Sequence, residues 1–186
     1  CLVQVASPEE AFAFDPLADG LDMAPFLKLL SNESILKVLH AGGQDIEIFV
    51  NLTGKVPFPL FDTQIAAMAM GMGEQVSYAN LVAHFTGHQI DKGARFTDWA
   101  RRPLSDSQLV YALGDVTHLA ALYPKLRDRL QKDGRLDWVM SEMEGLTDPA
   151  LYDTNSENAW KRLKPKKFSA KYLAAFKAVA VWRERA

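Results

Sequence analysis

The stretch ILKVLHAGGQDIEIFVNLTG, residues 35–54, predicts a strand followed at once by a helix. The run ILKVLH is apolar, which favours a short buried strand. A helix follows the two glycines, and Gly54 can cap its C-terminal end. Because a strand leading directly into a helix is the building unit of α/β domains, this stretch decides the predicted fold class.

The segments on either side extend the same pattern. Upstream, LVQVA and FAFD predict a hairpin across SPEE, and Asp22 is placed to cap a helix through MAPFLKLL. Downstream, PFPLFD reads as a short extended piece, and TQIAAMAMG and YANLVAHFTG predict helices that end on glycine. Ser105 and Gln108 form a capping box for a helix through QLVYALGDVTHLAALY, which we expect Pro124 to kink or restart. We predict further helices at LDWVMSEM and ENAWKRL, and overall a mixed sheet flanked by helices.

The composition limits the classes of protein to which the chain can belong. Its 186 residues are 48% hydrophobic, so they can form a sizeable core, and Cys1 is the single cysteine. No apolar run reaches membrane length, and neither G-x-G-x-x-G nor a Walker A sequence occurs. We therefore expect a cytoplasmic protein with no membrane segment and no small-molecule cofactor. The chain opens on CLVQVAS and ends on VWRERA, which we interpret as cut ends of a longer protein.

Charge is unevenly distributed along the chain. Residues 1–156 carry a net charge of −9 and residues 157–186 one of +7, with the densest basic run, KRLKPKK, at 161–167. A basic segment behind an acidic body can bind a polyanion such as nucleic acid. It can also be a solvated linker around Pro165, and composition alone favours the linker.

Polar residues without an evident structural purpose are the candidate site. Asp45 falls in the first turn of the helix after the strand, where ligands gather in α/β sheets, although an acid there also favours the helix dipole. Tyr111 and Asp115 lie one helical turn apart and share a face. A mid-helix aspartate that is buried needs a partner or a metal, and a plain surface contact is the alternative. We expect Asp62 to cap the next helix.

The motifs LHAGGQD, DKGARFTDWARRPLSDSQ and YALGD, in that order, resemble the ribonuclease D family of 3′–5′ exonucleases in the DEDD superfamily. The resemblance runs from residue 2 to about residue 163, and RRPLSDSQ is its most specific part. The acid of the family's second motif matches Asp45, and its third motif, Tyr-x-x-x-Asp, matches Tyr111 and Asp115. The tyrosine is typical of the tyrosine subgroup, since the histidine subgroup would have His in place of Val110.

This resemblance implies a ribonuclease H-like three-layer α/β fold. Residues 1–148 would form the exonuclease domain, 149–167 a linker with the basic segment, and 168–186 the first helix of a helical nucleic-acid-binding domain. The family's first motif, Asp-x-Glu on the first strand, does not occur in the chain. We therefore expect that strand to be missing and the chain as given to show little or no activity.

The resemblance also implies the roles of the site residues. Asp45 and Asp115 would bind two divalent ions, Mg²⁺ or Mn²⁺, and Tyr111 would orient the attacking water. Trp99 is expected to fill core, and each arginine of RRPL either contacts phosphate or ties the loop to an acid. The predicted nucleic-acid contacts are His40, Gln44, Arg101, Arg102 and Gln108.

The function that the resemblance implies is hydrolysis of RNA from the 3′ end to nucleoside 5′-monophosphates. RNA, with tRNA precursors among the substrates, would be the partner, and tRNA 3′ maturation the role. A DNA-directed exonuclease of the same fold is one alternative, and a non-catalytic nucleic-acid-binding domain is another. An Asp-x-Glu motif upstream of Cys1 would favour the enzyme over the binding module.

Overall fold

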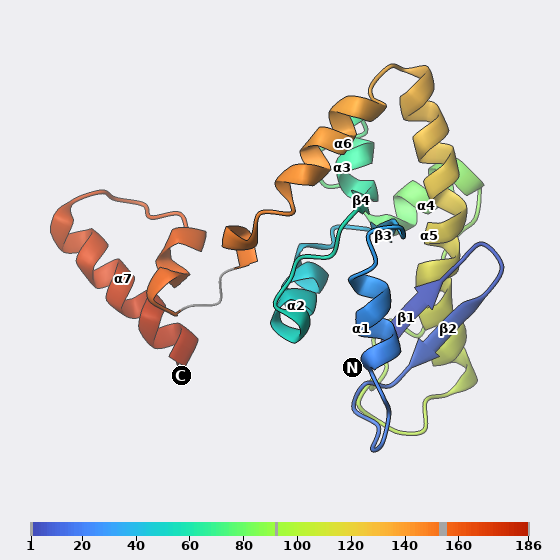
Figure 1. Ribbon diagram of the computed structural model, residues 1–186, viewed down its shortest axis with the longest axis horizontal. Coiled ribbons are helices and arrows are strands. Elements are labelled where there is room, and N and C mark those ends of the chain that lie inside the picture. Colours follow the sequence, from blue (N-terminus) through green and yellow to red (C-terminus); the bar gives the residue numbers. More distant parts are fainter. Residues whose placement is uncertain (1, 92, 153–155, 186) are drawn as a thin grey trace.

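The structure is a computed structural model that describes residues 2–91, 93–152 and 156–185. Figure 1 shows an α/β body crossed by one long helix and, set apart from it, a small helical unit near the C-terminus. In chain order the elements are β1 (Val3–Ala6), β2 (Ala11–Phe14), α1 (Ala24–Leu30), β3 (Lys37–Leu39), α2 (Gly43–Thr53), β4 (Leu60–Asp62), α3 (Thr63–Ala69), α4 (Tyr78–Thr86), α5 (Asp106–Lys132), α6 (Leu136–Gly145), the 3₁₀ helices η1 (Pro149–Tyr152) and η2 (Ser156–Arg162), and α7 (Ala170–Arg185).

The strands of the described residues form two pairs, where the sequence predicted one mixed sheet. β1 and β2 are antiparallel, with Val3 opposite Phe14, which confirms the predicted hairpin. β3 and β4 are parallel, with Leu39 opposite Asp62. Since parallel strands end at the same edge, the turn that follows Leu39 lies beside the end of β4. This edge is where Asp45 is positioned.

The helices follow the predicted stop signals closely. Gly54 and Gly87 are left-handed residues, each with φ 71°, that close α2 and α4. Pro124 does not restart the helix, because α5 continues through it. Leu122 and Leu126, on either side, are fully buried, so tertiary packing stabilises the helix across a residue that lacks an N–H donor.

The main core lies between α3, α4, α5 and α6. Phe61 in the middle of β4 packs edge-on against Tyr123 of α5, with ring centroids 5.0 Å apart. A smaller cluster of Ile46, Leu60 and Tyr152 joins α2 to η1. The first residues of the predicted linker therefore belong to the body rather than to a free connection.

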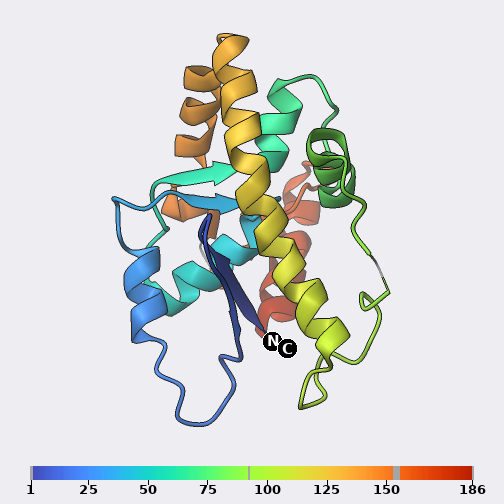
Figure 2. The same ribbon diagram turned by 90° about the vertical axis from the view of Figure 1, so that its right-hand side faces the viewer.

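The hairpin and the long helix support one another. α5 packs against both β1 and β2, and it also contacts β3. Figure 2 shows the hairpin lying alongside this diagonal helix. Through these contacts α5 is held against the strand pair whose edge carries the turn before Asp45.

The C-terminal unit consists of η2 and α7, which pack on each other. ENAWKRL forms the 3₁₀ helix η2 instead of the predicted α-helix. The ammonium of Lys177 lies 4.1 Å from the centroid of the Trp160 ring, and Arg185 pairs with Glu157. Trp182 remains 68% exposed. None of the helices in the described part of the chain is long and apolar enough to span a membrane.

Candidate active site

Asp45 lies in the first turn of α2, three residues after the turn formed by residues 39–42. Its side chain reaches solvent. Packing around the carboxyl group, and secondarily the negative charge of Asp62, raises the pKa of Asp45. Among the described residues its carboxylate makes no hydrogen bond or ion pair, so it is available to an external cation.

Asp62 fixes the turn before Asp45, which is a function that the sequence did not reveal. As predicted, it caps α3, because its Oδ1 accepts from the Gln64 N–H at 2.8 Å. The same carboxylate also accepts from the Ala41 N–H at 3.1 Å and from the Gly42 N–H at 2.8 Å. Asp62 is only 5% exposed, so three backbone donors satisfy a buried charge. A lone aspartate in a capping position carried no signal of this second role.

The turn itself is sterically demanding. Ala41 is the one described residue other than glycine with a positive φ, at 53°, a conformation that a Cβ atom disfavours. A Cβ atom added at Gly42 would lie 2.6 Å from Leu39 Cδ1 and 2.7 Å from Leu39 Cβ. Glycine is therefore needed at position 42 for space, whereas Gly43 has no atom within 4 Å of its virtual Cβ.

Thr63 holds the other half of the turn. Its hydroxyl donates to the Leu39 carbonyl at 3.1 Å and lies 2.9 Å from Nδ1 of His40. Burial lowers the pKa of His40, although the Asp62 charge opposes this effect. His40, a predicted nucleic-acid contact, is thus fixed by the body of the protein, and it packs against Tyr78 with ring centroids 5.4 Å apart.

Tyr78 connects this turn to the middle of α5. Its hydroxyl donates to the main-chain carbonyl of Asp115, and burial together with the Asp115 charge raises the pKa of Tyr78. Because His40 packs on the same ring, the end of β3 and the Asp115 segment meet across Tyr78. The sequence placed Tyr78 in a helix but gave no indication of this contact.

Tyr111 and Asp115 are both half-buried on α5. Burial raises the pKa of the Asp115 carboxyl. Burial and the Asp115 charge also raise the pKa of Tyr111, while Arg95 opposes the rise. The Asp115 carboxylate has no hydrogen-bond or ion-pair partner among the described residues. Trp99 is half-buried against Tyr111, with ring centroids 5.9 Å apart.

The loop that precedes α5 is anchored by Gln108 and Arg102. Gln108 completes the predicted capping box, and its amide nitrogen donates to Thr97 Oγ1 at 3.0 Å and to the Asp98 carbonyl at 3.1 Å. Its side-chain amide is buried and fully occupied, so a nucleic acid reaches it only by breaking these bonds. Arg102, also a predicted nucleic-acid contact, pairs with Asp15 at 2.6 Å, and this ion pair joins the loop to the residue that follows β2.

Two residues of this loop face outward. Phe96 is 89% exposed, and the Arg95 guanidinium lies 5.1 Å from the centroid of its ring. The predicted contacts Arg101 and Gln44 are also exposed. Exposed aromatic rings and arginine planes are surfaces on which unstacked bases pack. Arg95 and Phe96 were not predicted from the sequence, although an Arg-Phe pair in a polar loop is a usable signal.

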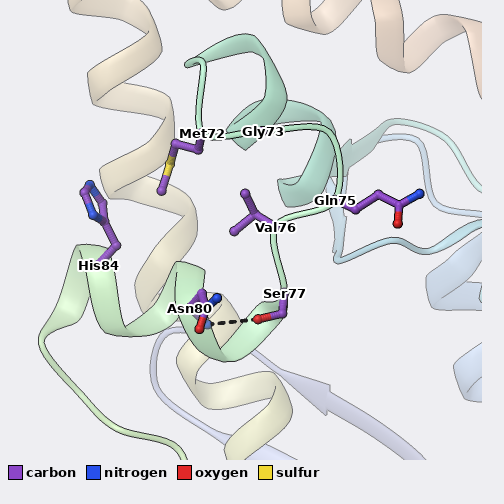
Figure 3. A pocket seen from close by; sticks show the side chains of 7 residues that line it. All are labelled: Met72, Gly73, Gln75, Val76, Ser77, Asn80 and His84. Atoms are coloured by element: carbon purple, nitrogen blue, oxygen red, sulfur yellow. Dashed lines mark hydrogen bonds between the residues drawn. The ribbon is translucent and has the colours of Figure 1, made fainter.

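A separate open pocket of about 470 Å³ lies between the α3–α4 loop and α4. Figure 3 shows its lining side chains, among them Gln75, Asn80 and His84. None of Asp45, Tyr111 and Asp115 lines it. The acids therefore belong to a surface outside this pocket.

The carboxylates of Asp45 and Asp115 are the type of ligand that a hard divalent cation prefers. Both are oxygen donors with raised carboxyl pKa values and no protein partner in the described residues, a situation that cation binding relieves. No cluster of three or more His, Cys, Asp or Glu side chains suited to a metal occurs within residues 2–91, 93–152 and 156–185. The remaining ligands of a two-metal site would have to come from elsewhere.

Comparison with known proteins identifies the family. A family model described as 3′–5′ exonuclease matches residues 1–131. The chain belongs to this exonuclease family. It is similar to ribonuclease D of Sphingobium indicum, with 57% identity over 185 residues that cover 99% of this chain and 48% of the relative. The chain thus spans about half the length of the curated relatives that it matches.

Solved structures of an exoribonuclease and of a second protein share the fold. Escherichia coli RNase D, described as an exoribonuclease involved in structured RNA processing, matches with a TM-score of 0.81 and 33% identity over 99% of this chain and 49% of that one. Brucella melitensis NrnC bound to pGG matches with a TM-score of 0.73 and 27% identity over 91% and 81% of the two chains. The same protein with bound Mg²⁺ matches with a TM-score of 0.62 and 28% identity, over 77% and 69% of the two chains. The predicted ribonuclease D resemblance and ribonuclease H-like fold class are confirmed.

Proposed function

We propose that the full-length protein hydrolyses RNA from the 3′ end and releases nucleoside 5′-monophosphates, with tRNA precursors among its substrates. The observation that carries the proposal is the pair Tyr111 and Asp115, one turn apart on α5, in a chain of the 3′–5′ exonuclease family. The Asp115 carboxylate is half-buried without a partner in the described residues, which is costly unless a cation binds it.

In this proposal each residue has a distinct task. Asp115 and Asp45 hold two divalent ions, together with ligands outside the described residues. Bound Mg²⁺ or Mn²⁺ would lower the pKa of the attacking water and offset charge on the phosphate oxygens. The Tyr111 hydroxyl, whose pKa is raised from a usual value of about 10 that already keeps it protonated at neutral pH, orients the water by hydrogen bonding. Arg101 and the Arg95–Phe96 pair contact the RNA strand.

The test uses the full-length protein and a 5′-labelled single-stranded RNA. We expect a ladder of products shortened from the 3′ end with Mg²⁺ or Mn²⁺, and none after chelation. A matched DNA strand and an RNA blocked by a 3′-phosphate serve as controls. Faster loss of the DNA strand would make the enzyme DNA-directed. Binding of RNA without shortening under either metal would refute the hydrolytic function and favour a binding module.

A further inference from the structure

We propose that Asp62 and Thr63, at the junction of β4 and α3, are positioning residues that place Asp45 for cation binding. Neither side chain would touch the cation or the substrate. They act on the turn of residues 39–42, which leads from β3 into α2. The inference rests on the proposed function, because the position of Asp45 matters for catalysis only if Asp45 serves the cation.

Helix α2 has no side-chain cap of its own. Its N-cap residue is Gly42, which has no side chain and makes no side-chain cap bond. The N–H groups of Ala41 and Gly42 instead donate to the two carboxylate oxygens of Asp62, at 3.1 and 2.8 Å. The start of α2 is therefore set by a residue 20 positions further along the chain, and Asp45 follows within its first turn.

The turn of residues 39–42 needs external support. Ala41 is held in the left-handed region, where its Cβ atom is disfavoured. Such a conformation persists when surrounding contacts over-determine it. Asp62 holds the Ala41 N–H, and Thr63 holds the carbonyl of Leu39 at 3.1 Å. A shift of this turn would move the first turn of α2 and the Asp45 carboxylate with it.

The hydrogen bonds made at position 62 require a carboxylate. Two oxygens accept from three N–H groups, including that of Gln64, so both oxygens are in use. An asparagine has one oxygen and a donor amide in place of the second oxygen, and this amide would face an N–H group. Asp62→Asn therefore keeps the shape of the side chain but breaks at least one tie to the turn or to the α3 cap.

The experiment compares Asp62→Asn with Asp22→Asn in the full-length protein. Asp22 is a matched control, because its Oδ1 also accepts a backbone N–H, from Ala24 at 2.9 Å, but it is not hydrogen-bonded to the turn. The readouts are kcat, KM for RNA, melting temperature, and the Mn²⁺ concentration for half-maximal rate. Loss of an outer-shell partner typically costs about 10–100-fold in metal affinity or activity.

We expect Asp62→Asn to lower kcat and to raise the Mn²⁺ midpoint, each by about tenfold or more, with KM for RNA within about twofold of wild type. Asp22→Asn should match the wild type in kcat and in the Mn²⁺ midpoint. A lower melting temperature with unchanged kcat and Mn²⁺ midpoint would make Asp62 a structural cap only and overturn the proposal.

A second pair of variants covers the case in which Asp62→Asn does not fold. Thr63→Val removes the hydroxyl, and Thr63→Ser retains it. Thr63→Val should shift kcat and the Mn²⁺ midpoint in the same direction, and Thr63→Ser should restore both. Equal behaviour of the two Thr63 variants would contradict a positioning role.

The positioning role is separable from the proposed function by calorimetric Mn²⁺ titration of the same proteins without RNA. If the wild type binds Mn²⁺ but degrades no nucleic acid, the proposed function fails, while weaker Mn²⁺ binding by Asp62→Asn still supports the positioning role. Equal Mn²⁺ affinity of the wild type and Asp62→Asn would overturn the positioning role whatever the activity.

Discussion

The two halves of the candidate site are built in opposite ways. On α5, Tyr111 and Asp115 are brought together by helix geometry alone, and the helix start is fixed by the capping box of Ser105 and Gln108 a few residues away. On α2, Asp45 is placed by a turn whose hydrogen-bond partners come from another strand. A half that depends on local geometry tolerates change elsewhere in the protein, whereas the Asp45 half depends on the packing of β3 against β4.

The largest effect is expected from substitutions in the α5 half of the site, Asp115→Asn and Tyr111→Phe, in the full-length protein. Asp115→Asn removes the charge of a proposed metal ligand, so it should cost more than the roughly 10–100-fold expected for an outer-shell group, and excess metal should partly rescue it. Tyr111→Phe should lower kcat by about a hundredfold through misplaced water, without rescue by metal. Its stability should change by no more than about 1 kcal/mol.

These outcomes are measured by metal titrations of kcat together with melting curves. Full turnover in Tyr111→Phe with a clearly lower melting temperature would show that Tyr111 serves the core and not the reaction.

The turn that places Asp45 is tested by substituting two neighbouring glycines, Gly42 and Gly43. Gly42→Ala places a Cβ atom 2.6 Å from Leu39 Cδ1 and 2.7 Å from Leu39 Cβ, so the turn must shift. We expect a loss of about 1–3 kcal/mol in the free energy of unfolding, as for other overpacked sites. Gly43→Ala has open space and lies in α2, so it should be neutral or stabilising by up to about 1 kcal/mol.

Chemical denaturation of the two variants decides this point. If Gly42→Ala were as stable as Gly43→Ala, the turn would be more adaptable than the contact with Leu39 indicates.

Phe96→Ala tests whether the outward face of the loop before α5 meets the substrate. Phe96 is exposed, so its removal should leave the melting temperature unchanged. Loss of one stacked base contact is worth about 1–3 kcal/mol, so KM for RNA should rise by roughly tenfold. Steady-state kinetics on a single-stranded RNA measures this change, and an unchanged KM would remove Phe96 from the substrate path.

Substitution of the two arginines of RRPL, Arg101 and Arg102, should have different effects. Arg101 is exposed, so Arg101→Ala should weaken RNA binding at an unchanged melting temperature and reduce the salt-dependence slope by about 1. Arg102 is tied to Asp15 and to the Trp99 carbonyl, so Arg102→Ala should lower the melting temperature. Binding titrations at several salt concentrations distinguish them. The reverse assignment of effects would make Arg102 the phosphate contact.

The smallest effect concerns the pH dependence of the Asp15–Arg102 tie. The hydrogen bond from Arg102 holds the pKa of Asp15 below its usual range. A carboxyl group with a lowered folded pKa stabilises the protein above its unfolded pKa of about 3.9. That contribution is lost as the pH falls through the lower folded pKa. Asp15→Asn should therefore melt slightly below the wild type at neutral pH, and the two melting temperatures should converge in acid.

Much of the fold could be predicted because its signals are local. The hairpin, the cap at Gly54, the cap by Asp62 and the capping box at Ser105 each depend on a few consecutive residues. The expected restart at Pro124 does not occur, because burial of Leu122 and Leu126 stabilises a continuous helix where a local rule predicts a break. Where the tertiary packing energy exceeds the local conformational preference of a residue, packing determines the structure.

The sequence by itself determined that Tyr111 and Asp115 share a helix face, because a spacing of four residues fixes their relation in any α-helix. It also determined that Asp45 opens a helix after a strand. Only the tertiary structure decided that Asp62 and Thr63 hold the turn before Asp45, and that Tyr78 joins the turn to the Asp115 segment. These contacts join residues 20 or more positions apart, and no periodicity encodes them. They form only when β3 pairs with β4 and when α4 packs on α5.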